Sequence, residues 1–385
     1  MAYQNVGTPR FYIDYFSYWQ SIGLIESIVN YSGTINGTPL GLDPVTPFTI
    51  SGEPDTNGDF IFAVDLKDNI DPRALESINY IGYLGHTFGD ATAAAIRMDF
   101  SKKLTGAIGE WGSNSPRGAC TQINVSKDAE IINAEHIHLG AGLDNYTSFD
   151  NSGFSLYKVN ANQNHDGEVD RFNMVFKQYN DSGVIPQTDY ADINALWNLN
   201  CFTMGHFYDM PVSPDLDVKM EIEFDGYDST ETLGGSTLTN VRYEGAPKWG
   251  NNNAWEIGES NPYYKRRGRR SWDLKFSYIS DKDIFASNYS SSNWLSNTTD
   301  NSDYNSNNDL TSDENNFEYT LADDDSFIAK VLNFVGNGQR FIFQSDNTNN
   351  NPDQFAICVL DQDSLSISQK AFKSYEISLK IREVW

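Results

Sequence analysis

Hydrophobic and polar residues alternate at every second position over much of this chain. Within residues 217–224 the hydrophobic positions are Val218, Met220, Ile222 and Phe224. An alternation with period two predicts a β-strand that buries one face and leaves the other in water. The same pattern recurs at residues 60–66, 94–100, 172–176, 271–278 and 374–381. Clusters of Gly, Asn, Asp and Ser separate these segments, as turns require.

Helical spacing of hydrophobic residues is rare by comparison. One candidate helix begins after the acidic run 323–325 and has hydrophobic residues at Phe327, Val331, Phe334 and Val335. Acidic residues suit the start of a helix, and Gly336 or Gly338 can end it. A second candidate is residues 192–199. Strands without regularly alternating helices favour antiparallel sheets. We therefore predict an all-β fold of two antiparallel β-sandwich or jelly-roll-like domains with few short helices.

The chain divides into three expected regions. Residues 1–50 contain a segment rich in aromatic residues, which we interpret as an N-terminal arm or interface segment. Residues 51–225 are predicted to form a first sandwich and residues 226–385 a second. A tract rich in Ser, Asn and Asp at residues 287–316 is expected to be a polar insertion loop of the second domain.

The charge of the chain limits its partners. It has 385 residues, 14% aromatic residues and a formal net charge of −26. A high aromatic content is typical of folded chains, and an acidic surface repels nucleic acid and anionic membranes. We expect no sequence-specific nucleic-acid binding and no membrane insertion, because no apolar run approaches the ~20 residues that span a bilayer. The first residues contain no basic or apolar leader, so we expect the protein to stay, or to be assembled, in a cytoplasm.

The sequence contains few candidates for a chemical site. His136 and His138 could hold a metal on one face of a strand, or they are solvated. Residues 164–170 have oxygen ligands at alternate positions and a glycine, which fits a calcium loop or a hairpin turn. The three cysteines are far apart and match no zinc or disulfide pattern. No nucleophile motif is present, and a pair of glycosidase carboxylates stays open because it forms only in three dimensions. We predict a protein that is not an enzyme, with no catalytic, cofactor or metal site.

Two groups of residues are candidates for contacts with other proteins. The basic block 265–270 is unusual in an acidic chain, and it suits either an interface, through bidentate pairing of arginine with carboxylates, or a solvated turn. Aromatic residues are also enriched at interfaces. The interface residues predicted from the block and the N-terminal segment are Phe11, Tyr12, Tyr15, Trp19, Arg266, Arg267, Arg269 and Arg270. Sugar stacking or contacts between subunits are the alternatives for Trp249, Trp255 and Trp294.

Four stretches resemble segments of structural proteins of tailed bacteriophages. Residues 80–88 (YIGYLGHTF) are similar to the LGHNL-type segment of tail-associated proteins with a galactose-binding-like jelly roll, from which Thr87 and Phe88 depart. Residues 205–216, 268–278 and 375–385 resemble uncharacterised virion structural proteins of tailed marine phages. The closing strand is also similar to β-domains of distal tail and tail-tube proteins, which close into rings. The resemblance covers most of the chain after residue 80 and implies a galactose-binding-like jelly roll in the first domain.

The function implied by this resemblance is structural. We expect a component of a phage tail, baseplate or adaptor ring that is assembled in the host cytoplasm and becomes part of the virion. Its expected partners are copies of itself in a ring or array and other phage structural proteins. The alternatives are a tail module that binds a receptor or a host-surface glycan, and a decoration protein on the capsid surface.

Overall fold

Strands dominate the structure of this protein, which is a computed structural model. It describes residues 7–30, 34–45, 48–51, 59–70, 78–85, 94–101, 121–124, 130–131, 154–158, 169–180, 183–184, 198–224, 227–241, 248–249, 252–253, 268–285, 325–336 and 338–384. The strand pairs in these ranges are antiparallel. The helices among them are short, and the predicted all-β fold class is confirmed.

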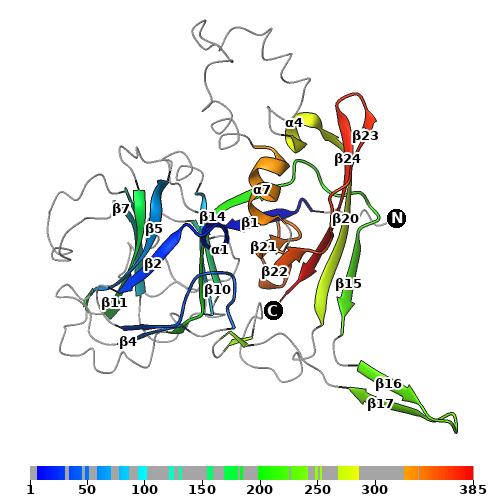
Figure 1. Cartoon of the computed structure of the whole chain (residues 1–385), viewed down its shortest axis with the longest axis horizontal. Coiled ribbons are helices and arrows are strands. Elements are labelled where there is room, and N and C mark those ends of the chain that lie inside the picture. The colour runs from blue at the N-terminus through cyan, green and yellow to red at the C-terminus, as the bar shows by residue number, and fades with distance from the viewer. Residues whose placement is uncertain are drawn as a thin grey trace, which may run out of the picture.

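The main element is a sheet of 11 strands. Its path runs through β15 (Lys219–Glu223), β20 (Arg269–Ser280), β24 (Ser374–Glu383), β22 (Phe355–Leu360), β21 (Phe341–Gln344), β1 (Arg10–Asp14), β14 (Cys201–Asp209), β6 (Tyr80–Leu84), β10 (Phe154–Lys158) and β9 (Glu130–Ile131), with β23 (Ile367–Ala371) beside β24. Strands from both sides of position 225 in the sequence belong to this sheet (Figure 1). The domain boundary expected at residue 225 therefore does not separate two sheets, because strands from both sides of it belong to one sheet.

Strand β1 lies in the middle of this large sheet, between β14 and β21, and pairs with both. Its alternate side chains enter different hydrophobic cores, because Phe11 and Ile13 pack in one and Tyr12 packs in the other. The expectation of an N-terminal arm is thus corrected for residues 10–14. A strand with two paired edges and two buried faces has no free surface with which to reach a neighbouring subunit.

A six-stranded sheet lies beside the part of the large sheet that contains β14 and β10 (Figure 1). It consists of β2 (Ile25–Asn30), β5 (Asp59–Ile70), β11 (Val169–Asn180), β7 (Ala94–Ser101) and β8 (Thr121–Asn124), with β12 (Gly183–Val184) beside β11. The strands predicted at residues 60–66, 94–100 and 172–176 are confirmed as β5, β7 and β11. The smaller sheets comprise β13 (Asn198–Leu199), β4 (Phe48–Ser51) and β3 (Thr34–Asn36), then β16 (Tyr227–Glu231) with β17 (Thr237–Val241), and β18 (Lys248–Trp249) with β19 (Asn252–Asn253).

The described helices are α1 (Tyr15–Ser21), α4 (Asp281–Ile284), the π-helical turn η3 (Ile328–Leu332), α7 (Asn333–Val335) and the 3-10 turn η4 (Pro352–Gln354). The helix predicted after residue 325 is confirmed, with Phe327, Val331 and Val335 buried. Gly336 ends it at a φ of 49°. Of the other predicted helix, residues 198–199 pair with β4 as a strand instead, and residues 192–197 lie outside the described ranges. None of the described helices is long and apolar enough to cross a membrane.

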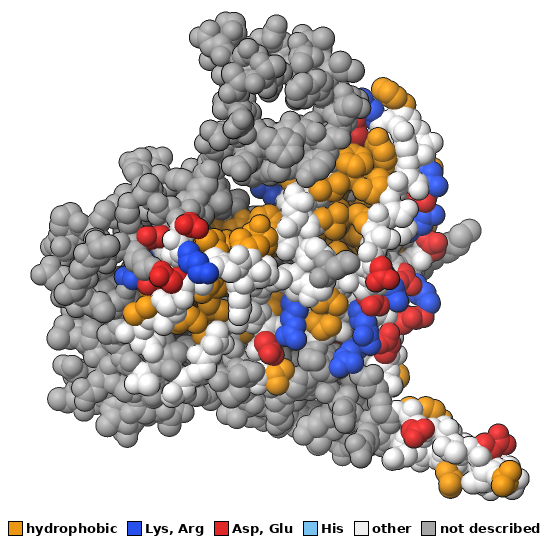
Figure 2. All heavy atoms as spheres, viewed as in Figure 1, with side chains coloured by type: hydrophobic (Ala, Val, Ile, Leu, Met, Phe, Trp, Pro, Cys, Tyr) orange, Lys and Arg blue, Asp and Glu red, His pale blue; other side chains and the backbone are white. Residues whose placement is uncertain are grey.

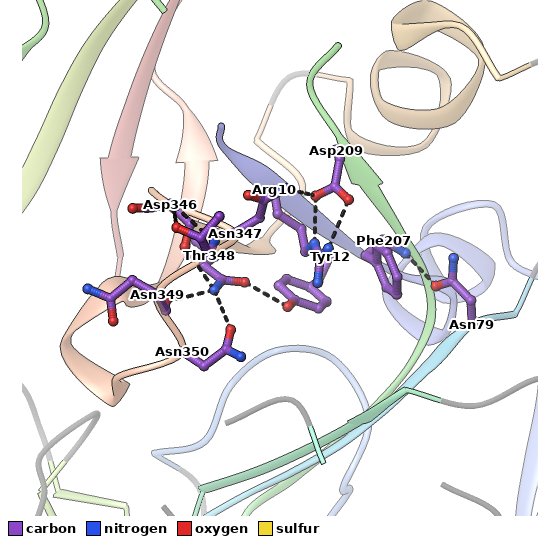
Figure 3. A network of polar contacts seen from close by, with 11 residues as sticks. Arg10, Tyr12, Asn79, Phe207, Asp209, Asp346, Asn347, Thr348, Asn349 and Asn350 are labelled. Carbon is purple, nitrogen blue, oxygen red and sulfur yellow. Dashed lines mark hydrogen bonds and ion pairs between the residues drawn. The ribbon is translucent and has the colours of Figure 1, made fainter. Parts of the chain in front are cut away.

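A polar network fixes β1 in its place (Figure 3). The Nε and Nη2 atoms of Arg10 donate to the two carboxylate oxygens of Asp209, at 2.6 and 2.8 Å. The guanidinium group of Arg10 lies 4.1 Å from the centre of the Phe207 ring. On the other side, the hydroxyl of Tyr12 donates to Oε1 of Gln344 at 2.8 Å, and the Gln344 amide nitrogen donates to three oxygens of the loop that follows β21. Charge-assisted and buried hydrogen bonds of this kind specify the register of a strand.

Candidate assembly surface

The four aromatic residues predicted at an interface lie inside the protein. Phe11, Tyr12, Tyr15 and Trp19 are exposed by only 0, 0, 3 and 5%. The ring centre of Trp19, on α1, lies 4.9 Å from that of Phe172 on β11, so α1 contacts the six-stranded sheet as well as the large one. Their assignment to an interface is corrected, because buried side chains have no surface to offer a second protein. They join sheets of the same chain.

Of the four arginines predicted at an interface, the structure describes Arg269 and Arg270. Arg266 and Arg267 lie outside the described residues. Arg270 is an internal residue that donates from Nε and Nη2 to the carboxylate oxygens of Glu383, both at 2.9 Å, and their side chains are only 15% and 5% exposed. Its assignment to an interface is corrected, because the bidentate pair is already satisfied inside the sheet. Arg269 is partly buried at the start of β20.

Exposed hydrophobic side chains concentrate in another part of the chain. Seven of the twelve large hydrophobic side chains that are exposed among the described residues lie within 23 positions. They are Leu216, Met220, Ile222, Phe224, Tyr227, Leu233 and Leu238. Single exposed hydrophobic residues are ordinary, whereas a concentration of them in one segment is a candidate interaction surface.

Strand β15 contributes the first part of this group. Among the described strands it pairs only with β20, so it forms an edge of the large sheet. The predicted alternation is present, but its hydrophobic face is not buried, since Met220, Ile222 and Phe224 are 55, 47 and 59% exposed. Met220 pairs with Trp272 on β20, which is buried. The hydrophobic core beneath the sheet thus ends at β20, and β15 extends beyond it. An exposed edge strand with a hydrophobic face is a template for pairing with another chain.

The hairpin β16–β17 contributes the second part. It projects from the body of the molecule and carries exposed hydrophobic side chains (Figures 1 and 2). Within residues 227–240 every residue except Thr232 is exposed, and Leu233 at the turn is fully so, at 111%. A two-stranded hairpin without a core is marginally stable in water. One signal in the sequence could have predicted this exposure: Ser, Thr, Asp and Asn occupy both alternate sets of positions, so neither face can be buried.

A third exposed group lies at the other end of β20, around the turn between β23 and β24. The alternation predicted that Tyr278 would be buried with Phe276, but a β-bulge between Phe276 and Ile279 shifts the register. Ile279 is therefore buried, at 1%, while Tyr278 is 77% exposed and Phe372 is 85% exposed. Bulges re-aim side chains in this way. Tyr278 has a φ of 71°, which bulky residues rarely adopt.

The segments that carry these two aromatic residues also carry lysines, and Nζ of Lys373 lies 5.9 Å from the centre of the Phe372 ring. Lys275 and Lys370 each lie 3.2 Å from the carboxylate of Glu376. Lys373 lies 3.9 Å from the carboxylate of Asp281. One carboxylate shared by two lysines leaves this end of the sheet less acidic than the chain as a whole.

Two buried ionisable side chains, Asp14 and His206, make hydrogen bonds inside the protein. Asp14 caps α1 by accepting from the backbone nitrogen of Ser17 at 2.8 Å, and burial raises its pKa although its hydrogen bonds lower it. Nδ1 of His206 lies 2.8 Å from the hydroxyl of Tyr15, and Nε2 lies 2.6 Å from the backbone oxygen of Lys330. Burial is the main cause that lowers the pKa of His206 to about 3. The imidazole is thus neutral and held on both nitrogens, as suits a packing residue.

A shallow, open cleft of about 420 Å³ lies between α1, the loop at residues 40–43 and the loop at residues 338–340. Gln20, Asp43 and Arg340 line it with amide, carboxylate and guanidinium groups. Arg340 is held by a hydrogen bond of 2.8 Å to the backbone oxygen of Leu42. The volume falls within the usual range for small-molecule sites, and apolar atoms make up more of the lining than polar atoms do.

Most of the remaining candidates fall where the structure gives no description. His136, His138 and the calcium-like residues 164–168 lie outside the described ranges, as do Trp255, Trp294 and the loop at 287–316. Within the described ranges, no group of three or more His, Cys, Asp or Glu side chains could hold a metal ion.

No family model matches this sequence, and no curated protein matches it. A solved structure of the CBM32-1, CBM32-2 and M60 catalytic domains of Clostridium perfringens ZmpB is similar, with 11% sequence identity and a TM-score of 0.26. The match covers 72% of this chain and 31% of that one, so this chain spans about a third of that structure's length. A similarity of this degree carries no conclusion about function.

Proposed function

We propose that this protein is a structural component of a tailed phage particle and not an enzyme. In this proposal it belongs to the tail, baseplate or an adaptor ring, is assembled in the host cytoplasm, and associates with copies of itself and with other phage structural proteins. The observation that supports an assembly role is the run of exposed hydrophobic side chains from Leu216 to Leu238 on an edge strand and a coreless hairpin. The assignment to a phage particle rests on the resemblance of residues 205–216, 268–278 and 375–385 to virion structural proteins of tailed phages.

Burial of the hydrophobic side chains of β15 alone does not supply enough free energy for association. Burying one large hydrophobic side chain contributes roughly 1.5–3 kcal/mol. The three on β15 therefore contribute about 5–9 kcal/mol when fully buried, which the association cost of about 4–15 kcal/mol can cancel. The hairpin adds three more large hydrophobic side chains, Tyr227, Leu233 and Leu238, whose burial doubles the favourable free energy. We thus expect the hairpin to decide whether copies associate.

Sedimentation velocity over a range of concentrations tests this proposal. The wild-type chain should form oligomers as its concentration rises, and the double variant Leu233→Ser with Leu238→Ser should remain monomeric. Ile22→Ser is the matched control, because Ile22 is also exposed, at 56%, but lies outside the proposed surface. A wild-type chain that stays monomeric throughout would remove the support for self-assembly. Mass spectrometry of purified particles then tests whether the chain is a virion protein.

The cleft at Gln20, Asp43 and Arg340 supports a second candidate function, a tail module that binds a host-surface glycan. Its amide, guanidinium and carboxylate groups are those that pair with sugar hydroxyls or an acidic sugar. A glycan array probed with the wild-type chain and with Gln20→Ala tests this function. Binding that the variant loses would favour the glycan module, and an array with no signal would reject it.

A further inference from the structure

We infer that copies of this chain associate head to tail, with the hairpin β16–β17 of one copy on the lysine–aromatic end of the next. The lysine–aromatic end comprises Tyr278, Lys282, Lys370, Phe372 and Lys373. The inference rests on the proposed assembly function and names the surface that receives the hairpin. The occupant of that surface is a second copy of the same chain.

The two surfaces lie at opposite ends of the same strand, so they cannot meet within one copy. Glu223, after which the chain enters the hairpin, pairs with Arg269, the first residue of β20. Tyr278 lies near the other end of this 12-residue strand, about 30 Å away at about 3.3 Å per residue. The hairpin points away from the body, and the turn between β23 and β24 lies at the opposite end of the sheet (Figure 1). Contact between them requires two molecules.

Both surfaces present large hydrophobic side chains that nothing in the described structure covers. Tyr227 and Leu238 of the hairpin are 65 and 63% exposed, and Leu233 projects from its turn. Tyr278 and Phe372, at 77 and 85%, are exposed to a similar degree at the other end. Aromatic anchors of this kind dominate the binding energy of protein interfaces.

The charges of the two surfaces favour this pairing over contact between like surfaces. The hairpin, residues 227–241, has Asp228 and Glu231 and no Lys or Arg. The segments 275–284 and 367–376 contain four lysines and three acidic residues, and Asp215, which accepts a hydrogen bond from Ser277, adds a fourth carboxylate, so this end is neutral in a chain whose net charge is −26. Two hairpins in contact would place carboxylates together, whereas a hairpin on the lysine–aromatic end places its two carboxylates beside lysines on a surface without excess negative charge. Such complementarity selects the partner and its orientation.

Backbone strain marks the same end of the molecule. Among the described residues, the non-glycine residues with positive φ are Tyr278, at 71°, and Lys373, at 54°. Both belong to the lysine–aromatic end. Strained residues of this type persist where the surrounding structure imposes them, and they cluster at functional sites. The bulge between Phe276 and Ile279 keeps the Tyr278 ring in solvent, where a second copy can contact it.

A contact between two different surfaces leaves one of each free on every dimer. Such heterologous contacts propagate into a closed ring when the rotation closes and into a filament when it does not. The prediction is therefore an open series of oligomers, or one ring of fixed size, and not a dimer that stops at two copies.

Mixing two variants tests the head-to-tail arrangement. One variant, Leu233→Ser with Leu238→Ser, lacks the hairpin anchors, and the other, Tyr278→Ser with Phe372→Ser, lacks the receiving anchors. All four positions are mostly exposed, so both variants should fold. Each alone should be monomeric, with self-association weakened by about tenfold or more. An equal mixture should form dimers and nothing larger in sedimentation velocity, because each dimer has one intact contact.

Two outcomes separate this inference from the proposed function. If the Tyr278→Ser, Phe372→Ser variant assembles as the wild type does, the head-to-tail contact is refuted while self-assembly stands. If the wild type itself does not assemble, both are refuted. A charge reversal supplies a second readout. Lys282→Glu with Lys370→Glu should weaken assembly, and mixing that variant with Asp228→Lys, Glu231→Lys chains should restore oligomers in which the two variants alternate, because both kinds of contact in the mixture join opposite charges. A mixture that stays monomeric would contradict the charge pairing.

Discussion

Replacement of Tyr278 by glycine should make the fold more stable and the assembly weaker. The φ of Tyr278 is 71°, a conformation that costs a non-glycine residue about 1–3 kcal/mol. Glycine adopts it without strain but loses about 0.4–1 kcal/mol through the greater freedom of the unfolded chain. Because the ring is 77% exposed, its removal costs little packing. The expected gain in the free energy of unfolding is about 1 kcal/mol.

Tyr278→Ala is the matched control, because it loses the ring but keeps the Cβ atom. Urea unfolding followed by tryptophan fluorescence should find the glycine variant about 1 kcal/mol more stable than the alanine variant. Equal stability of the two would refute the role assigned to strain. Both variants should weaken self-association to the same degree, since both lack the ring, while Tyr278→Phe should preserve it. Association that follows the backbone strain and not the ring would refute the role assigned to the aromatic group.

Three further predictions concern the body of the protein. Phe11→Ala should lower the free energy of unfolding in urea by about 3–5 kcal/mol, because it leaves a cavity in the core, whereas Ile22→Ala at an exposed position should change it little. Glu383→Gln should lower it by about 3 kcal/mol, because it leaves the buried Arg270 without its counter-charge; an unchanged stability would contradict the structural role of this pair. His206, with a folded pKa of about 3 against the ordinary 6.5, contributes stability above pH 6.5 that is lost as the pH falls. We expect a loss of about 1.4 kcal/mol per pH unit between pH 6 and 4, and urea unfolding of His206→Gln should lack that part of the slope.

Much of the fold class could be read from local patterns. The alternation at residues 60–66, 94–100, 172–176 and 374–381 predicted strands that the structure contains, since one buried face imposes period two on any half-buried strand. The helix at residues 327–335 followed equally from its spacing and its terminal glycine. Such patterns depend only on residues that are close in the sequence, so these strands and this helix could be predicted without knowledge of distant contacts.

The candidate site could not be read in the same way. The strand at 217–224 has the pattern of a half-buried strand, but its burial depends on whether a core extends beneath it, and the core ends at β20. The exposure of Tyr278 depends on a bulge of one residue, which reverses the alternation after Phe276. A local pattern predicts which residues share a face and not what covers that face.

The sequence by itself determined the strands, their turns, the acidic surface and the helix at residues 327–335. Only the tertiary structure decided that β1 is a central strand, that Arg270 is an internal partner of Glu383, and which hydrophobic faces are left in solvent. The physical reason is the range of the contacts involved. The hydroxyl of Tyr12 on β1 donates a hydrogen bond to Gln344 on β21, 332 positions away in the sequence. A contact at that separation cannot be predicted from the alternation of neighbouring residues.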